Sequence, residues 1–410
     1  MVTSIGAGSE RRALIVGTAV TVTGSLPVFF IGAMAVQLTR DLGFGTVGIG
    51  AATAVFFGSM AVSAPFLGRA ADRLGATRSL RIATLASALA SGGIALLAWH
   101  WWMLAVWLAL AGMATAFSQP AVNRLLVNRV RLDRLGTAFG LKQSAPPTAS
   151  MLAGLSVPAI ALTIGWQWAY VATAVAALAA TVAVGPRPAT PPTPPSRREG
   201  NRVEPLRDRP TLVVLALGFT LAFASSSVLL SYYVDSAVHA GEPQDYAGLV
   251  FALASLTAVA ARVLAGMACD RYVFRPLNLC AVFLGFGAAG LALMAVGGRP
   301  AMTLGAVLGL TGTWGFPGVF WFALVRAYPD TPGRITGAMA PAAGGAMFGP
   351  VLFGVLASGP GYPIAWSVSA VTAMLAGVAM LFGARRLPST GPQLETAPHD
   401  TTPTEAVEDR

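Results

Sequence analysis

GRAADRLGATRSLR, residues 68–81, places four arginines, one aspartate and two glycines between two long apolar runs. A shorter copy of its first part, GMACDR, stands at residues 266–271 and again follows an apolar run. Charge of this density is costly beside hydrocarbon, so both stretches are expected in loops between membrane-spanning segments. Their similarity indicates that the chain contains an internal repeat.

The apolar runs around these loops cover most of the chain. Hydrophobic residues make up 55% of the sequence and charged residues 11%, whereas soluble domains carry about 25% charged residues. Runs of at least about 18 apolar residues can cross the hydrocarbon layer as helices. We predict twelve spans, at residues 13–37, 46–67, 80–98, 102–123, 138–162, 168–185, 211–235, 246–265, 278–297, 301–323, 336–357 and 364–384. The first is too long and too polar for a cleaved signal segment.

The arginines between the spans predict the orientation. They gather in alternate loops, whereas the other loops hold only Arg40 and Arg299. This bias is the positive-inside pattern, and it predicts an integral protein of the cytoplasmic (inner) membrane with both termini in the cytoplasm. It also explains the net charge of +10 without a nucleic-acid partner.

A polar segment at residues 186–210 divides the spans into two sets of six. It is rich in Pro, Arg and Glu and has no apolar periodicity, so we predict a solvated cytoplasmic linker. The linker would join an N-terminal bundle, 1–185, to a C-terminal bundle, 211–387, and the acidic tail at 388–410 is expected to be disordered. Cys269 and Cys280 fit neither a disulfide nor a metal pattern, and we expect no cofactor.

The two arginine-rich loops share a motif with a known family. The signature G-x-x-x-D-R-x-G, between the second and third helices of major facilitator superfamily transporters, resembles Gly68, Asp72, Arg73, Gly75 and Arg78, and part of it recurs at Gly266, Asp270 and Arg271. The resemblance implies an all-α membrane protein with twelve transmembrane helices in two pseudo-symmetric six-helix bundles. It also implies that Asp72 bridges the halves and closes the cytoplasmic side when the outside is open. Alternatively, the arginines only enforce topology.

Four spans carry polar side chains at helical spacing. Such side chains should face protein or a water-filled cavity, and in the superfamily fold the first, fourth, seventh and tenth helices surround the cavity. We therefore expect cavity residues at Thr21, Ser25, Gln119, Asn123, Ser227, Ser231, Trp314 and Trp321. The alternative is that the hydroxyls hydrogen-bond only to their own helix or to a neighbour.

The fifth span of each half is interrupted by prolines, namely Pro146, Pro147 and Pro158 in the first half and Pro341 and Pro350 in the second. Interruptions at matching positions of two repeats point to the moving or binding region. The run Gly345-x-x-x-Gly349-Pro350 resembles an antiporter motif of the superfamily. That motif belongs in the first half, however, and Leu108 replaces an arginine that drug/proton antiporters often carry.

Three charged residues fall inside the predicted spans or at their ends. Lys142, the single lysine of the chain, and Arg262 are expected to face the seam between the halves from opposite sides, since the fifth and eighth helices are neighbours in the superfamily fold. Together with Gln143 they are candidates for anion binding, and Arg262 resembles an arginine of monocarboxylate-type members. Snorkelling to the headgroups or gate salt bridges are the alternatives. Asp235 is the candidate for proton coupling.

These patterns predict a secondary transporter that moves a small organic solute, with an organic anion or carboxylate as a candidate, by alternating access and with H+ as the coupling ion. A proton-driven drug or metabolite efflux pump is the alternative. An enzyme is disfavoured, because His100, His239 and His399 lie in loops or the tail, and no nucleophile–base pair is visible. A channel would need a charged ring or filter loop. The expected partners are the solute, the bilayer and the proton, bound by a monomer.

Overall fold

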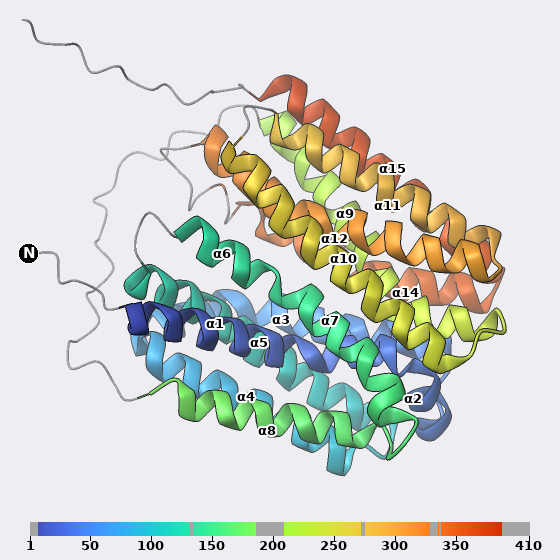
Figure 1. Ribbon diagram of the computed structural model, residues 1–410, viewed down its shortest axis with the longest axis horizontal. Coiled ribbons are helices and arrows are strands. Elements are labelled where there is room, and N and C mark those ends of the chain that lie inside the picture. The colour runs from blue at the N-terminus through green and yellow to red at the C-terminus, as the bar shows by residue number, and fades with distance from the viewer. Residues whose placement is uncertain are drawn as a thin grey trace, which may run out of the picture.

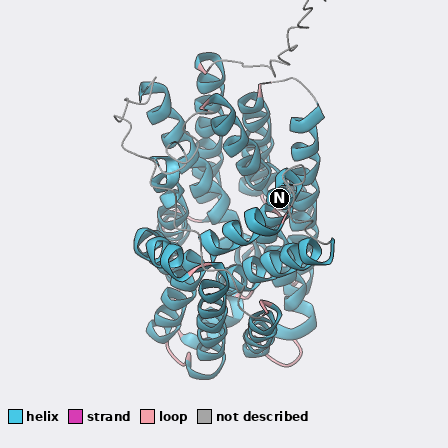
Figure 2. Cartoon of the chain, turned by 90° about the vertical axis from the view of Figure 1, so that its left-hand side faces the viewer, coloured by secondary structure: helices cyan, strands magenta, loops and turns pink. Residues whose placement is uncertain are grey.

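The computed structural model describes residues 7–130, 135–185, 209–271, 275–328, 335 and 338–387. This part of the chain is helical nearly throughout and contains no strand (Figure 2). The predicted tail and nearly all of the predicted linker lie outside it. The helices form an N-terminal and a C-terminal group that lie side by side (Figure 1).

The N-terminal half begins with a broken helix and ends just before the predicted linker. Its elements are α1 (Ala7–Ala33), α2 (Ala35–Leu42), α3 (Thr46–Leu74), α4 (Ala76–Leu97), α5 (Trp101–Arg129), α6 (Leu135–Gln143), α7 (Ala145–Ser156), the π-helical turn η2 (Val157–Ala161) and α8 (Gln167–Ala183).

The C-terminal half consists mostly of long unbroken helices. Its elements are α9 (Arg209–His239), α10 (Gln244–Arg271), α11 (Pro276–Val296), α12 (Arg299–Ala327), the 3-10 turn η3 (Ala340–Gly344), α14 (Gly345–Ser358) and α15 (Tyr362–Arg386).

Ten helices of the described residues are long and apolar enough to cross a membrane. This confirms the all-α membrane fold, but the fifth predicted span, 138–162, is divided into α6, α7 and η2. Pro146 and Pro147 occupy the start of α7, where a helix needs no backbone donor, and Pro158 lies in the π-helical turn. Proline removes a helical hydrogen bond and crowds the preceding turn, which explains the interruptions. The sixth span is the 17-residue helix α8.

The bundle has two distinct ends. The described segments next to both termini and to the predicted linker meet at one end, which lies on the left in Figure 1 and is called the terminal end below. There Arg12 donates to the Ala183 carbonyl and Arg81 donates to the Gly185 carbonyl. The opposite end, which contains α2 and the start of α3, is called the far end.

Glycines bring the helices of the C-terminal half close together. Gly290 of α11 faces Gly305 and Gly309 of α12, and a Cβ atom added at Gly305 would lie 2.7 Å from the Gly290 carbonyl oxygen. Small residues allow such close approach between membrane helices. α12 therefore packs closely against α11 with its glycine-lined face, and its opposite face points toward the centre of the molecule.

The two halves pack against each other along α3 and α14, α7 and α10, and α1 and α9. Glycines again mark the closest approaches. A Cβ atom at Gly154 would lie 2.7 Å from the Gly248 carbonyl oxygen, and Gly32 and Gly50 face the carbonyls of Leu230 and Pro350. All these contacts lie toward the far end, so the halves are in backbone contact there.

Candidate substrate cavity and its gates

The serine and threonine residues of the predicted cavity lie in the packed part of the bundle. Thr21, Ser25, Ser227 and Ser231 are buried, and each hydroxyl donates to a carbonyl three or four residues earlier in its own helix. Ser231 also hydrogen-bonds across the halves to Thr53, at 3.0 Å between the two hydroxyl oxygens. In this structure the hydroxyl protons of these residues are therefore already donated within the protein.

The inner face of α12 borders open space. A Cβ atom added at Gly318 would have no neighbouring atom within 4 Å. On one side of it Trp314 is buried and donates to the Ser226 carbonyl at 3.2 Å. On the other side Trp321 is half-buried, with its ring centroid 5.3 Å from that of Phe219. The open face therefore lies on the terminal side of Trp314.

Lys142 and Asn123 of the predicted cavity lie together. Lys142 of α6 is 6% exposed, and its Nζ donates to Oδ1 of Asn123 on α5 at 2.7 Å. Gln119, one turn earlier on α5, is half-buried as Asn123 is. The partner of the Lys142 ammonium is thus a neutral amide.

Arg262 of α10 joins the two halves. Its Nε donates to the Trp314 carbonyl at 2.5 Å, and its Nη1 donates to the carbonyl of Gln143, the residue after Lys142. The guanidinium also lies 5.4 Å from the centroid of the Trp314 ring, within the range of a cation–π contact. The structure thus brings Arg262 to the segment that carries Lys142.

The halves close on each other directly beyond these cations. Ser150 of α7 and Ser255 of α10 hydrogen-bond across the seam at 2.8 Å. They border a small gap of about 160 Å³ that is otherwise lined mainly by apolar side chains, including Phe29 and Leu310, and that is too narrow for water. The open space beside α12 therefore does not continue to the far end along this seam.

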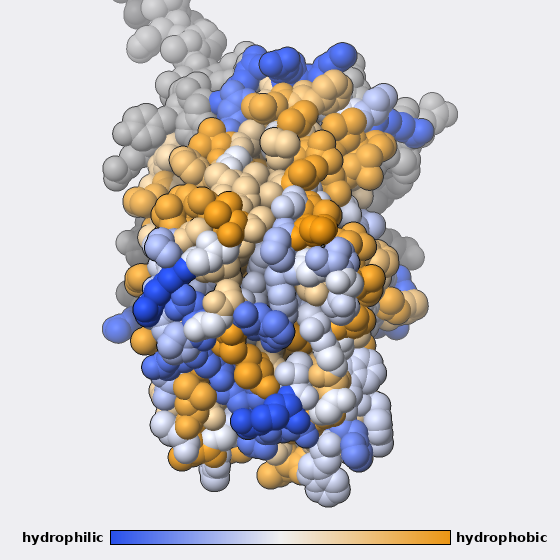
Figure 3. Space-filling view, turned by 90° about the vertical axis from the view of Figure 1, so that its right-hand side faces the viewer, coloured by the Kyte–Doolittle hydropathy of each residue, from blue (hydrophilic) through white to orange (hydrophobic). Residues whose placement is uncertain are grey.

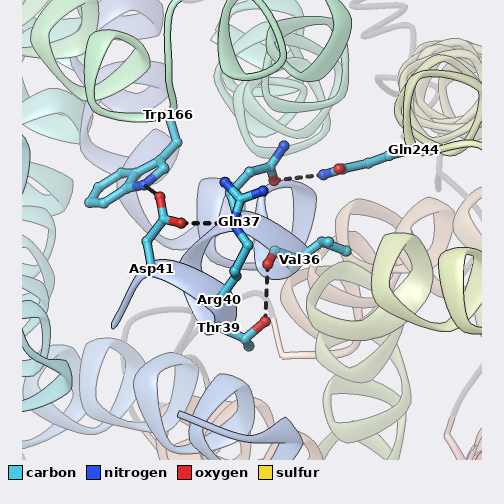
Figure 4. A network of polar contacts seen from close by, with 7 residues as sticks. All are labelled: Val36, Gln37, Thr39, Arg40, Asp41, Trp166 and Gln244. Carbon is cyan, nitrogen blue, oxygen red and sulfur yellow. Dashed lines mark hydrogen bonds and ion pairs between the residues drawn. The ribbon is translucent and has the colours of Figure 1, made fainter. Parts of the chain in front are cut away.

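The far end is closed by a network of polar contacts, shown in Figure 4. Gln244 of α10 donates to Oε1 of Gln37 on α2 at 2.6 Å and so links the halves. Within the N-terminal half, Trp166 donates to Asp41 at 3.0 Å and Asp41 pairs with Arg40 at 2.9 Å. Figure 3 looks onto this end, where separate hydrophilic patches lie among hydrophobic ones.

Asp235 of α9 belongs to the far end. It is 6% exposed, and its Oδ2 accepts a hydrogen bond from the Tyr362 hydroxyl at the start of α15. The neighbouring Trp366 donates to the Ser236 hydroxyl at 2.9 Å. The candidate proton carrier is therefore separated along the bundle from the cations near α6 and α10.

The sequence predicts loops at both arginine-rich stretches, but most of the motif at residues 68–78 is helical: Gly68 to Leu74 form the last turns of α3, and α4 begins at Ala76 after a turn at Gly75. The shorter copy at residues 266–271 likewise ends α10. Gly75 adopts a φ of 78°, which favours glycine. Asp72 forms an ion pair with Arg124 of α5, so its partner in this structure lies in its own half. Arg73 and Arg78 are exposed, and a Cβ atom at Gly68 or Gly266 would meet no atom within 4 Å. The side chains of Asp270 and Arg271 lie outside the described part.

Some contacts between the halves were not predicted from the sequence. The Tyr232 hydroxyl donates to the Thr46 carbonyl at 3.0 Å, and Gln37 bonds to Gln244. Gln37 could have been predicted from the sequence. Its amide stands at the end of an apolar span and is as costly to bury as the amide of Gln119, which was predicted to face the cavity. Tyr362 and Thr46 stand at span ends beside loops. Polar residues are common there, so their presence does not indicate a contact between the halves.

Comparisons with known proteins agree with this architecture. The crystal structure of a D-xylose-proton symporter superposes with a TM-score of 0.70 at 15% sequence identity, and the alignment covers 92% of this chain and 98% of that one. At this identity the likeness concerns the fold alone. A search among curated proteins found no match. The profile of the Major Facilitator Superfamily matches residues 14–345, which is most of the sequence. The chain therefore belongs to the Major Facilitator Superfamily and is an integral membrane transporter, not an enzyme.

Proposed function

We propose that the protein moves small organic anions, carboxylates above all, across the cytoplasmic membrane by alternating access, with protons as the coupling ion. Family membership makes it a secondary transporter of small molecules. The substrate class rests on one observation, the surroundings of Lys142 and Arg262.

Both cations are held by neutral oxygen atoms. Lys142 donates to an amide oxygen, and Arg262 donates to two backbone carbonyls. Among the described residues no carboxylate forms an ion pair with either of them. Lys142 is buried and Arg262 is half-buried, and positive charge that is partly kept from water without a countercharge raises the free energy of the protein. A carboxylate that reaches the site lowers this free energy, which favours anionic solutes over neutral ones.

The two cations come from different halves. Lys142 belongs to α6 of the N-terminal half and Arg262 to α10 of the C-terminal half. The planar guanidinium matches a carboxylate in a bidentate arrangement, whereas the ammonium is a compact charge that accepts many geometries. An anion held by both would link the rocking halves, so binding would be coupled to their relative movement.

The orientation follows from the arginine bias. Arg69, Arg73 and Arg78 stand at the terminal end, which the positive-inside rule assigns to the cytoplasm. The termini then lie in the cytoplasm, and this structure corresponds to the state that is closed outside and accessible from inside. The open face beside Gly318 supports an entry from the terminal end.

Proton coupling is proposed through Asp235. It is a buried carboxylate on a helix that packs against the other half, and it accepts a hydrogen bond from a tyrosine hydroxyl. A solved protein of the same fold is a D-xylose-proton symporter. A carboxylate that alternates between a wet and a dry setting is suited to take up and release a proton.

The test is uptake by the full chain in proteoliposomes with an imposed proton gradient. The probes are labelled lactate and benzoate, each compared with its neutral amide. We expect uptake of a carboxylate and not of its amide. Lys142→Ala and Arg262→Ala should each weaken the apparent affinity about 10- to 100-fold, because each removes a charge-assisted hydrogen bond of about 1.5–3 kcal/mol.

Arg299→Ala is the matched control, since Arg299 is an exposed cation that pairs with Glu242 at the far end. It should transport like the parent. Equal uptake by the parent and by both cavity variants would refute anion binding at this site. Expulsion of cationic dyes without carboxylate uptake would favour the efflux pump instead.

A further inference from the structure

The first turn of α3 is docked on the C-terminal half at the far end. The Tyr232 hydroxyl of α9 donates to the Thr46 carbonyl at 3.0 Å and lies 2.9 Å from the Pro350 carbonyl oxygen. Tyr232 is fully buried. A Cβ atom at Gly354 of α14 would lie 3.0 Å from the Cα atom of Val47. Opening of the far end must therefore separate this turn from α9 and α14.

Asp235 reaches the same turn through a tyrosine. It stands one turn after Tyr232 on α9 and accepts a hydrogen bond from the Tyr362 hydroxyl. The first turn of α3 begins at Thr46, which lies near that hydroxyl. Asp235 in the C-terminal half is thus close, through Tyr362, to the docked turn of the N-terminal half.

The other titratable groups at this end leave the charge of Asp235 poorly compensated. His239, one turn later on α9, packs against Tyr362 in a tilted arrangement, with 5.1 Å between the ring centroids, and lies near Asp235. Tyr232, one turn earlier on α9, is a further titratable neighbour of Asp235 beside Tyr362. Arg40 of α2 pairs with Asp41, and Arg299 of α12 pairs with Glu242. None of the ion pairs among the described residues includes Asp235.

We propose that Asp235 is a proton-binding site built into the far-end closure, and that a proton bound there favours the closed state. An ionised carboxylate shut away from water is costly unless several donors compensate it, and among the described residues one hydroxyl does so. The neutral acid carries no such cost. The proton comes from water at the open far end and adds to one carboxylate oxygen, and no other covalent bond changes.

The proton site rests on the proton coupling proposed above. It adds that the bound proton stabilises the closed far end. The carboxylate acts on the gate and not on the solute, because it lies in the closure while the candidate anion site lies near α6 and α10. A drop in pH outside would then shut the far end over a loaded transporter.

The experiment measures the far-end distance by pulsed electron spin resonance in lipid nanodiscs without any solute. Spin labels are placed by Trp99→Cys and Val296→Cys, exposed positions in opposite halves at this end. Cys269 and Cys280 are replaced by alanine. The closed-to-open ratio of the parent should fall about tenfold between about pH 5 and about pH 8.

Four variants test whether the pH response of the far end depends on Asp235 or on a neighbouring residue. Asp235→Asn should stay closed at every pH, because the amide mimics the neutral acid. Tyr362→Phe removes the donor to the carboxylate and should make the ratio fall more steeply with pH, whereas Tyr233→Phe, a matched change on α9, should behave like the parent. His239→Gln should retain the pH response.

The proposal is overturned by a parent without pH response, by Asp235→Asn that still responds, or by His239→Gln that no longer does. The measurement needs no substrate. Failure of carboxylate uptake would therefore refute the anion proposal and leave the gate result interpretable, and the reverse also holds.

Discussion

The interface between the halves differs between its far end and its middle. At the far end helices touch through glycines, with Gly50 against the Pro350 carbonyl and Gly32 against the Leu230 carbonyl. Near α6 the contact depends on the long side chain of Arg262, which spans the seam to reach Gln143. The first contact is set by shape and tolerates no added volume, whereas the second can exchange a backbone partner for a ligand. The far-end seal and the proposed solute site thus lie at different places along the interface.

Gly50→Ala should break the far-end contact most strongly. The added methyl group would collide with the Pro350 carbonyl and with the Tyr232 hydroxyl, and the main-chain atom cannot rotate away. We expect a cost of about 1–3 kcal/mol for the closed state, or about a 5- to 150-fold fall in the closed-to-open ratio. The spin-label pair described above measures it.

Gly92→Ala is the control, since a methyl group there meets no atom within 4 Å. An unchanged ratio in Gly50→Ala would show that the halves do not close by backbone contact at this position.

Arg262→Lys should weaken the middle contact next. A lysine carries one compact ammonium and cannot donate in the two fixed directions that reach the Trp314 and Gln143 carbonyls. We expect about a tenfold rise in the dissociation constant for a carboxylate, measured by calorimetry on purified protein. An affinity equal to that of the parent would mean that only the charge matters at this position.

Gln244→Ala should have a smaller effect on the far end. It removes the neutral hydrogen bond to Gln37, worth about 1 kcal/mol, so the closed-to-open ratio should fall about fivefold. Because neither amide titrates, the fall should be equal at every pH. A change in the pH response would contradict the assignment of the proton site to Asp235.

Asp72→Asn should have the smallest effect. The Asp72 and Arg124 side chains are 49% and 31% exposed, and ion pairs of this kind contribute about 0.2–1 kcal/mol. The melting temperature of the detergent-solubilised protein should therefore shift by about 2 °C or less. A large loss of stability would indicate that Asp72 already holds the halves together in this state.

The fold was predictable from the sequence because a lipid environment makes each span satisfy its own backbone. Hydropathy alone therefore located the long helices of both halves. It failed at 138–162, where the apolar average hides Pro146, Pro147 and Pro158 and the chain forms three short elements. Proline acts through a single missing hydrogen bond, and a window average cannot register it.

The candidate site was also predictable only in part from the sequence. Lys142 and Arg262 stood out because charge is rare in an apolar span. Which oxygens they would meet was not readable, since that depends on how two helices turn against each other. Tyr232 and Thr46 are 186 positions apart in the sequence, and no local pattern connects them.

Gln37 shows how such a seal stays reversible. Its buried amide accepts one hydrogen bond, from Gln244, and its Nε2 has no partner among the described residues. Whichever way the amide is turned, one of its polar atoms stays unpaired, at a cost of about 1–3 kcal/mol that water would relieve on opening. The unpaired atom keeps the free energy of the closed far end above the lowest value it could have. A transporter that must open and close in every cycle benefits from such a closure, because less free energy is then needed to open it.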